Sequence, residues 1–349
     1  MSRSTIYRYG LLLLIIGVVF SCLDDSPQVN EKKISFPSGE LKISGSLITP
    51  TNLPGPYPVV VLVHGDGAMP YDAYGYYKPI WTEFAKRGIA TLSWDKPGVG
   101  GSSGNWLEHS MEERAEIVRN AISYLRTQNA VIDQQHIGLM GFSQAGWVLP
   151  KISNQQHQVD FAVFVGTAIN WLRQGQYHRS ISNGTGSNPE FYKTLPDSLL
   201  TQAVKQNLSF AAYQSAHQDM LTSDPNYNEG LFNDEARYGF IAKNWMNDAS
   251  SELSQIDIPI LAAFGQDDLN VDINDSIYHY RQAFAHNDPE LLSIKQFSGA
   301  SHGLLQSWFW NTQSPGIAHI LMIEFFGKSM FADNSLDQIA TWVERQVQH

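Results

Sequence analysis

Two kinds of residue are scarce in this sequence, cysteine and basic residues, and each scarcity excludes a class of chemistry. Cys22 is the only cysteine among 349 residues, so no disulfide can form within the chain. The absence of a cysteine pair and of His-Glu-x-x-His spacing removes the usual zinc signatures, and we expect no metal ion. The net charge is −11 and no basic stripe is present, which argues against a nucleic-acid partner.

A nucleotide cofactor is also not expected. The glycine-rich stretch "GVGGSSG", which begins at Gly98, lacks the lysine of a P-loop and does not fit G-x-G-x-x-G. We interpret it as a flexible loop. The remaining composition, 43% hydrophobic and 16% charged, is that of an ordinary globular protein long enough for one large α/β domain with an insertion or for two small domains.

The N-terminal residues have the pattern of an export signal. Arg3 and Arg8 precede an apolar run, "GLLLLIIGVVF", which is too short for a comfortable membrane span. The sequence "VFSC" that follows resembles the lipobox of bacterial lipoproteins, in which the cysteine carries the lipid. We therefore expect a signal peptide over residues 1–21, lipidation of Cys22, and a polar tether over residues 22–31. The protein would then be exported and held at the cell envelope by acyl chains alone.

Strand-like and helix-like segments alternate along the rest of the chain. Runs such as "VVVLVHG" and "DFAVFVG" are continuous and β-branched, which is typical of strands buried on both faces of a parallel sheet. We expect a hairpin at 32–49 and strands near 59–65, 88–95, 136–141, 160–166, 258–265 and 291–297. Helices are expected near 78–86, 110–128, 144–153, 276–285 and 335–348. This order predicts an α/β protein with a doubly wound, mostly parallel sheet.

The alternation stops between about residues 168 and 257. This polar segment has many aromatic residues and no strong strand signal. We interpret it as a helical cap inserted into a single domain that spans residues 32–349. Its aromatic side chains either line a substrate pocket or form the cap's own small core, and the sequence does not decide between these alternatives.

Ser143 is the candidate nucleophile. It lies in "GLMGFSQAGWVLP", between a predicted strand and a predicted helix, where a nucleophile elbow would place it. The motif G-x-S-x-G is incomplete because Ala145 replaces the last glycine, but one methyl group should displace the turn only slightly. A helix that begins after Ser143 would direct its N-terminal amides toward developing negative charge. A serine that merely caps a buried helix is the alternative.

A second motif supplies candidates for the oxyanion hole. "VLVHGDG" places His64 and Gly65 at the carboxyl end of a buried strand, the edge at which α/β sheets bind ligands. We expect the backbone amides of Asp66 and Gln144 to bind the oxyanion, with Gly67 as the alternative to Asp66. The Asp66 carboxylate must then point away, since it would oppose an oxyanion. His64 is expected to hold the loop in place.

An acid and a base follow in the order that a catalytic triad requires. His302, in "GASHG", is the candidate base, and it follows a strand near the C-terminus. After the cap, "GQDDLNV" offers two carboxylates, and the spacing Gly265-x-x-Asp268-x-x-Val271 favours Asp268 over Asp267. The order Ser, Asp, His is that of α/β-hydrolases. The histidine would accept the serine proton, and the acid would orient the imidazole and stabilise its charged form.

Together these motifs resemble those of the α/β-hydrolase superfamily from about Lys32 to the C-terminus. "HGDG", "DKPGVGGSSG", "GFSQAGW", "GQDDLNV" and "GASHG" are similar to motifs of bacterial exported esterase-like or dienelactone-hydrolase-like members. The resemblance implies hydrolysis of a small-molecule carboxylic ester through a serine acyl-enzyme, without a cofactor. A thioesterase, an exopeptidase and a membrane-anchored binding protein with a silent triad remain alternatives. The oligomeric state is not predicted.

Overall fold

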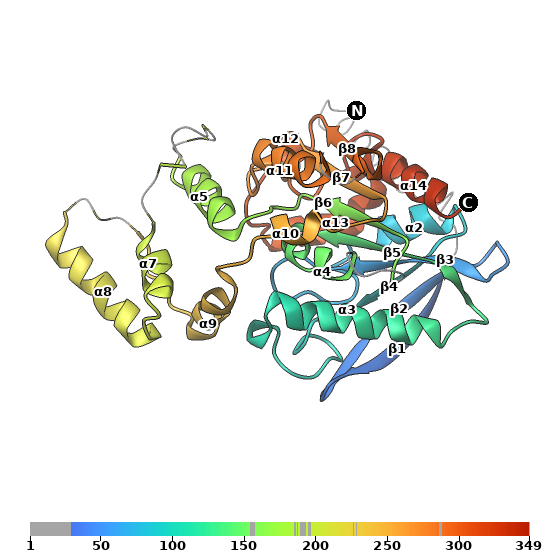
Figure 1. The fold of residues 1–349 in the computed structure, drawn as a ribbon, viewed down its shortest axis with the longest axis horizontal. Helices are drawn as coiled ribbons and strands as arrows, with labels where there is room; N and C mark the ends of the chain where they lie inside the picture. Colours follow the sequence, from blue (N-terminus) through green and yellow to red (C-terminus); the bar gives the residue numbers. More distant parts are fainter. Residues whose placement is uncertain are drawn as a thin grey trace, which may run out of the picture.

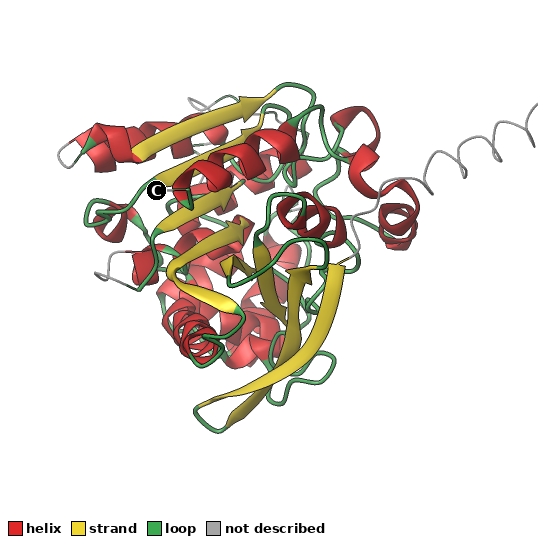
Figure 2. Ribbon diagram, turned by 90° about the vertical axis from the view of Figure 1, so that its right-hand side faces the viewer, coloured by secondary structure: helices red, strands yellow, loops and turns green. Residues whose placement is uncertain are grey.

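The computed structural model describes residues 29–153, 158–184, 186, 188, 193–194, 197–225, 227, 229–285 and 288–348. Its centre is an eight-stranded sheet covered by helices on both faces (Figures 1 and 2). The strands are β1 (Val29–Ser38), β2 (Leu41–Pro50), β3 (Tyr57–Val63), β4 (Ala90–Trp94), β5 (Ile132–Phe142), β6 (Phe161–Val165), β7 (Ile260–Gly265) and β8 (Leu292–Phe297). The helices on the sheet are α2 (Lys78–Ala85), α3 (Met111–Arg126), α4 (Pro150–Ser153), α11 (Ile273–Ala285) and α14 (Ser335–Gln346).

The strands are arranged in the order β1-β2-β4-β3-β5-β6-β7-β8. The β1–β2 and β2–β4 pairs are antiparallel, and all pairs from β4 to β8 are parallel. The carboxyl ends of β3, β5, β6 and β7 therefore meet at one edge. The predicted fold class, a doubly wound and mostly parallel α/β sheet with a helical insertion, is confirmed.

Alternate residues of the central strands supply two separate cores. Val59, Val61 and Val63 pack with α3, α4 and α11 on one face of the sheet. Val60 and Leu62 pack with α2 and α14 on the other face. Because successive side chains of a strand point to opposite faces, a strand covered on both sides must be apolar at every position. This explains the uninterrupted hydrophobic runs in the sequence.

The segment after Ser143 differs from the expected helix over 144–153. It forms a 3-10 turn, η2 (Ser143–Trp147), followed by the four-residue helix α4. Pro150 has no N–H to donate to the preceding turn, so the helical hydrogen-bond series is interrupted there. The expectation of one continuous helix over 144–153 was wrong.

The insertion between β6 and β7 is helical in its described residues. It contains α5 (Trp171–Ser182), α7 (Leu199–Lys205), α8 (Phe210–Ser223), α9 (Glu235–Asn244) and the short α10 (Ser250–Leu253). In Figure 1, α7 and α8 project away from the sheet, whereas α5 and α9 lie next to it. The two connections to the sheet run side by side, because Asn170 forms an antiparallel bridge with Asp248. We call this insertion the cap.

Two helices near the C-terminus were not expected from the sequence. Helices α12 (Ser307–Trp310) and α13 (Ile317–Phe326), with the 3-10 turn η4 (Gly327–Met330), lie between β8 and α14. The sequence of α13, "IAHILMIEFF", is apolar except for His319 and Glu324 and so lacks the continuous polar face that marks an amphipathic helix. Two further 3-10 turns, η1 (Trp106–Glu108) and η3 (Pro289–Leu291), are short connections.

The predicted signal peptide over residues 1–21 and the lipidation site Cys22 lie outside the described residues. The first described strand begins at Val29, so residues 29–31 of the expected tether belong to β1. Among the described residues, no helix has the length and apolar character needed to cross a membrane.

We predict that Gly265→Ala destabilises the protein whereas Gly239→Ala does not. A Cβ on Gly265 would lie 2.2 Å from the carbonyl oxygen of Ser301, so the loop that carries His302 would have to move. Overpacking of this kind typically costs about 1–3 kcal/mol. Gly239, within α9, has nothing within 4 Å of the added atom, and alanine there should stabilise by about 0.5–1 kcal/mol. Denaturant unfolding measures both; equal stability of the two variants would contradict the prediction.

Candidate active site

Ser143 occupies a strained turn at the end of β5. Its φ angle is +51°, in the left-handed region that non-glycine residues seldom adopt. This is the conformation of a nucleophile elbow, which lifts the serine side chain above the edge of the sheet. Ala145, where the motif usually has glycine, is fully buried in the core against α4. The turn therefore accommodates its methyl group.

The loops after β3 and β6 approach Ser143 and His302 closely. A Cβ on Gly65, after β3, would lie 3.2 Å from the Cβ of Ser143. Phe142 pairs with Val165 across β5 and β6, so Ser143 and Gly166 follow neighbouring strands. A Cβ on Gly166 would lie 3.1 Å from Nδ1 of His302. The sheet thus brings the candidate nucleophile and the candidate base to adjacent strand ends.

The imidazole of His302 is held by Asp268. Its Nδ1 lies 2.7 Å from Oδ2 of Asp268, whose side chain is completely buried. The other carboxylate oxygen, Oδ1, accepts the backbone N–H groups of Asn270 at 2.7 Å and of Val271 at 2.9 Å. The carboxylate is therefore fixed by three hydrogen bonds, and it keeps a proton on Nδ1 so that Nε2 is free to act as a base.

Asp267, the other carboxylate considered for this role, is engaged elsewhere. Its Oδ2 accepts the hydroxyl of Ser307 at 2.5 Å, at the start of α12. The side chain is exposed, whereas that of Asp268 is buried below His302. Of the two candidates, the structure brings Asp268 to the imidazole.

The Asp268 carboxylate determines the charge state of His302. Burial alone would lower the pKa of the imidazole, but the charge and the hydrogen bond of Asp268 outweigh burial and raise the pKa above its ordinary value of 6.5. Among the described residues, no hydrogen bond joins the ring to Ser143. Such bonds are often long before substrate binds. A rotation of the Ser143 side chain about χ1 is the movement that would most directly change the distance between its hydroxyl oxygen and Nε2 of His302.

Two buried basic side chains hold the loop that carries Asp66, although burial and the neighbouring Arg114 lower the pKa of Lys96 well below its ordinary value. Lys96 donates to the carbonyl oxygens of Gly65 at 2.5 Å and of Gly67 at 2.9 Å. Arg114, from α3, donates to the carbonyl of His64 at 2.6 Å. In a trans peptide, C=O and N–H point in opposite directions. Because the Gly65 carbonyl faces Lys96, the amide of Asp66 faces the other side of the loop.

His64 anchors the start of this loop as a neutral side chain. Its Nε2 donates to the carbonyl oxygen of Trp94 at 2.5 Å, and its Nδ1 accepts the hydroxyl of Tyr77 at 3.0 Å. Burial, together with the charges of Lys96 and Arg114, lowers the pKa of His64 to about 3. The same burial lowers the pKa of Arg114 to about 10, which leaves the guanidinium charged at neutral pH.

The Asp66 carboxylate faces an arginine of the cap. Arg237, on α9, donates from Nη1 to Oδ1 at 2.8 Å and from Nη2 to Oδ2. Gln144 donates from Nε2 to the same Oδ1 at 3.1 Å, and its Oε1 accepts from Arg114. Burial would raise the pKa of Asp66, but the hydrogen bonds and charge of Arg237 hold it below its ordinary value. The Asp66 side chain is 43% exposed, so the pair contributes at most about 1 kcal/mol to folding.

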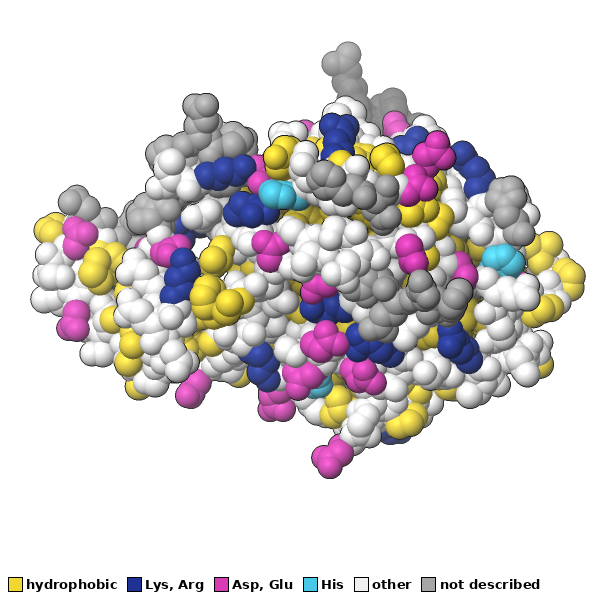
Figure 3. Space-filling model, in the orientation of Figure 1, with side chains coloured by type: hydrophobic (Ala, Val, Ile, Leu, Met, Phe, Trp, Pro, Cys, Tyr) yellow, Lys and Arg dark blue, Asp and Glu magenta, His cyan; other side chains and the backbone are white. Residues whose placement is uncertain are grey.

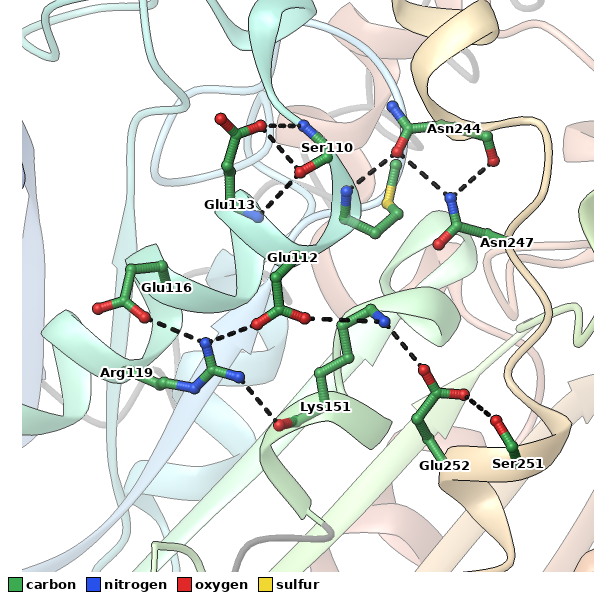
Figure 4. A network of polar contacts seen from close by, with 11 residues as sticks. Ser110, Glu112, Glu113, Glu116, Arg119, Lys151, Asn244, Asn247, Ser251 and Glu252 are labelled. Atoms are coloured by element: carbon green, nitrogen blue, oxygen red, sulfur yellow. Dashed lines mark hydrogen bonds and ion pairs between the residues drawn. The ribbon is translucent and has the colours of Figure 1, made fainter.

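The cap contacts the acid as well. Tyr177, on α5, donates its hydroxyl to the backbone carbonyl of Asp268 at 2.7 Å. A polar network joins the C-terminal end of the cap to the body (Figure 4). In it, Asn244 of α9 accepts the backbone N–H of Met111, at the start of α3, at 3.0 Å, and Lys151 of α4 pairs with Glu252 of α10 at 2.9 Å.

A cavity of about 370 Å³ lies within the cap, between α5, α7, α8 and α9. Its walls are mixed: Trp171, Tyr213 and Phe232 supply aromatic surface, and Arg179 and Arg237 supply charge. Apolar side chains border a hollow in this part of the surface in Figure 3. The cap also has a small core of its own around Val204, Tyr213 and Tyr238. Val204 and Tyr213 belong to this core and also line the cavity, so the core that the sequence suggested is present, and use of the cavity by a substrate stays a prediction.

Sequence analysis missed Lys96, Arg114, Tyr177 and Arg237. Only Arg114 left a signal, because it shares the helical face of Ile117, Ala121 and Leu125, which is otherwise apolar. An arginine on a buried face needs a polar partner, so this position marked an internal polar site. The other three belong to loops or to the cap, whose position relative to the sheet cannot be read from sequence periodicity.

The comparison with known families agrees with this arrangement. The profile of the family described as serine aminopeptidase, S33, matches residues 54–307, which is most of the chain. The chain belongs to this family of α/β-hydrolases. The match extends from just before β3 to just beyond His302. It does not distinguish the dienelactone-hydrolase-like branch. A comparison with curated proteins gives no sequence match.

Solved structures share the fold of this S33 family member at low sequence identity. The esterase Pf2001 of Pyrococcus furiosus is 13% identical, with a TM-score of 0.55 over 91% of each chain. Est1E of Butyrivibrio proteoclasticus, solved with ferulic acid bound, is 14% identical, with a TM-score of 0.53 over 89% of this chain and 96% of its own. The α/β-hydrolase GrgF of Penicillium sp. sh18 is 17% identical, with a TM-score of 0.55 over 92% and 100%.

The two adjacent aspartates give a matched test of the acid. We predict that Asp268→Asn lowers kcat about 10⁴-fold, because asparagine stabilises the wrong tautomer of His302. Asp267→Asn should change kcat less than tenfold, since that residue binds Ser307. Activity should increase with pH through a midpoint above 6.5, because the base must be neutral and Asp268 raises its pKa.

A pH–rate profile of all three proteins measures these effects. In Asp268→Asn the residual activity should show a lower midpoint, since the charge that raises the pKa of His302 is gone. Equal losses in the two variants, or an unchanged midpoint, would argue against Asp268 as the acid.

Proposed function

We propose that this protein is a serine hydrolase that cleaves small-molecule carboxylic esters through an acyl-enzyme. The observation that carries the proposal is the convergence of a strained Ser143 and the Asp268–His302 pair at neighbouring strand ends. No single one of these features is specific to serine hydrolases. A buried carboxylate that orients a histidine beside an elbow serine has, however, little structural purpose other than activation of a hydroxyl group.

In the proposed mechanism, Nε2 of His302 accepts the proton as Ser143 Oγ attacks the ester carbonyl. The Asp268 carboxylate stabilises the imidazolium that forms, and the amides of Asp66 and Gln144 bind the oxyanion. The imidazolium then protonates the departing alcohol and leaves an acyl-Ser143 ester. A water molecule, deprotonated by the same imidazole, hydrolyses the acyl-enzyme. Arg114 and Arg237 place positive charge beside the loop that carries Asp66, which favours the anionic intermediates.

Peptide hydrolysis is the second candidate, because the matching family is described by an aminopeptidase activity. An exopeptidase needs a carboxylate that binds the substrate's free amine. Glu229 lines the cap cavity, but its carboxylate accepts the backbone N–H of Leu199 at 2.9 Å. We prefer the hypothesis of ester hydrolysis because an alkoxide or phenolate is easier to expel than an amine. A thioesterase would use the same residues.

We also propose that Cys22 carries a lipid that holds the exported protein at the membrane of a bacterial cell envelope. The support is the sequence alone: two arginines, a short apolar run and a single cysteine preceded by "VFS". Seven peptide units separate Cys22 from Val29, where β1 begins, so the tether spans at most about 25 Å. The hydrolase domain would then act close to the membrane surface.

The nucleophile is tested by Ser143→Ala. This variant should lose at least about 10³-fold of the wild-type rate on p-nitrophenyl acetate, because only the oxyanion hole and binding remain. A fluorophosphonate probe should label the wild-type chain at Ser143 and leave the folded variant unlabelled. A parallel series of p-nitrophenyl esters, acyl-CoA thioesters and aminoacyl anilides ranks the three substrate classes. A folded variant that hydrolyses these substrates at the wild-type rate would rule out Ser143 as the nucleophile, and a wild type that hydrolyses no class would favour a binding protein.

The lipid anchor is tested by mass spectrometry of the mature chain. We expect an N-terminal peptide that begins with a diacylglycerol-modified Cys22, and a Cys22→Ser variant that is no longer found in the membrane fraction. Ser21→Ala is the matched control, since a small residue at this position should still permit processing. An unmodified mature N-terminus at another residue would refute the assignment.

A further inference from the structure

We propose that Arg237 is a positioning residue through which the cap fixes the oxyanion hole. The proposal rests on the function proposed above and extends it to a residue about 90 positions after the nucleophile in the chain. It concerns the two residues whose backbone amides are assigned to the oxyanion, Asp66 and Gln144. The backbone amides of these two residues would bind the oxyanion. Their side chains form the hydrogen bonds that fix where those amides lie.

Four side chains form an unbroken series between α3 and α9. Arg114 donates to Oε1 of Gln144, and Gln144 donates from Nε2 to Oδ1 of Asp66 at 3.1 Å. Arg237 donates to both oxygens of the Asp66 carboxylate. The two inner members are the proposed oxyanion residues, and the two outer members are arginines. One arginine belongs to the body and the other belongs to the cap.

Arg237 has little freedom to move within this series. Its guanidinium carbon lies 4.9 Å from the ring centre of Phe240, on its own helix, and 5.4 Å from that of Trp106, in η1 of the body. The two aromatic rings and the bidentate contact with the carboxylate therefore fix the guanidinium plane in orientation as well as in position. A lysine has one compact charge and cannot reproduce the paired hydrogen bonds.

Helix α9 is also attached to the body at its other end. Asn244 accepts the backbone N–H of Met111 at the first turn of α3, as Figure 4 shows. Lys243 donates to the backbone carbonyl of Glu108 in η1. Arg114 lies on α3 less than one turn after Met111. The two helices are thus connected both directly and through the series of four side chains, which makes the position of α9 relevant to the oxyanion loop.

The charge of Arg237 matters as much as its geometry. The Asp66 carboxylate is next to the amide that would bind the oxyanion, and two negative charges in one small site oppose each other. Arg237 neutralises the carboxylate and holds it away from the reaction. Without Arg237, the carboxylate would be free to turn and to repel the tetrahedral intermediate. Removing the carboxylate as well should then relieve part of the damage.

The experiment compares Arg237→Ala, Arg237→Lys, Asp66→Asn and the double variant Asp66→Asn/Arg237→Ala with the wild type. The substrate is p-nitrophenyl acetate, because its acyl group is too small to extend into the cap cavity that Arg237 also lines. We expect Arg237→Ala to lower kcat about 10- to 100-fold, within the effect of weakening one oxyanion donor, with KM changed less than threefold. Arg237→Lys should recover only part of kcat, and the double variant should be faster than Arg237→Ala.

Lys205→Gln provides the matched control, since Lys205 forms an exposed ion pair with Asp197 at 2.6 Å elsewhere in the cap. It should leave kcat unchanged. Circular dichroism and thermal unfolding are measured for every variant, so that a folding defect is recognised. If Arg237→Ala is folded but unstable, the kcat values of Arg237→Lys and of the double variant are compared with that of the wild type instead.

Three results would overturn the proposal. They are an unchanged kcat in folded Arg237→Ala, a loss that appears only in KM, and a double variant no faster than Arg237→Ala. Failure of the proposed function looks different: the wild type itself would then neither hydrolyse any substrate class nor react with the probe.

Discussion

The close approach of backbone segments at the carboxyl edge of the sheet is the constraint on which the site depends. Gly65 lies against the elbow serine, Gly166 against the loop of His302, and Gly265 against the carbonyl groups of residues 300 and 301. Each contact would be lost if a side chain separated the two segments. The parallel register of β3, β5, β6 and β7 brings these strand ends together, and the glycines allow them to touch. The strained φ of Ser143 is maintained by this packing.

The two sides of the site carry opposite electrostatic environments. The side of the candidate base has one fully buried carboxylate, Asp268, which three hydrogen bonds hold in place beneath His302. The side proposed to bind the oxyanion has two arginines, Arg114 and Arg237, near a single carboxylate, Asp66. A reaction that develops positive charge on the imidazole and negative charge on an oxygen is favoured by this arrangement, because each new charge forms beside its opposite. The separation explains how two aspartates of one site can have different roles.

Much of the sheet and of the catalytic geometry could be predicted because local rules dominate there. A strand buried on both faces must be apolar at every position, so "VVVLVHG" and "DFAVFVG" indicated β3 and β6 directly. Asp268 and His302 were found because their loops follow strands whose ends must converge. The helix expected after Ser143 failed because the effect of Pro150 outweighed the apolar pattern. Helix α13 lacked a polar face, and the partners of Asp66 depend on how the cap packs, which no periodic pattern encodes.

The two connections of the cap run together where they leave the sheet. Asn170 and Asp248 bridge across them, the amide of Trp171 donates to the carbonyl of Asn247 at 3.0 Å, and the described helices between these points form their own small core. The two ends of the insertion are therefore held together next to the sheet. The number of residues between them does not affect how the strands pair. The length of the insertion and its outer helices could therefore change during evolution without altering the sheet, provided that the contacts of Tyr177 and Arg237 with the site are kept.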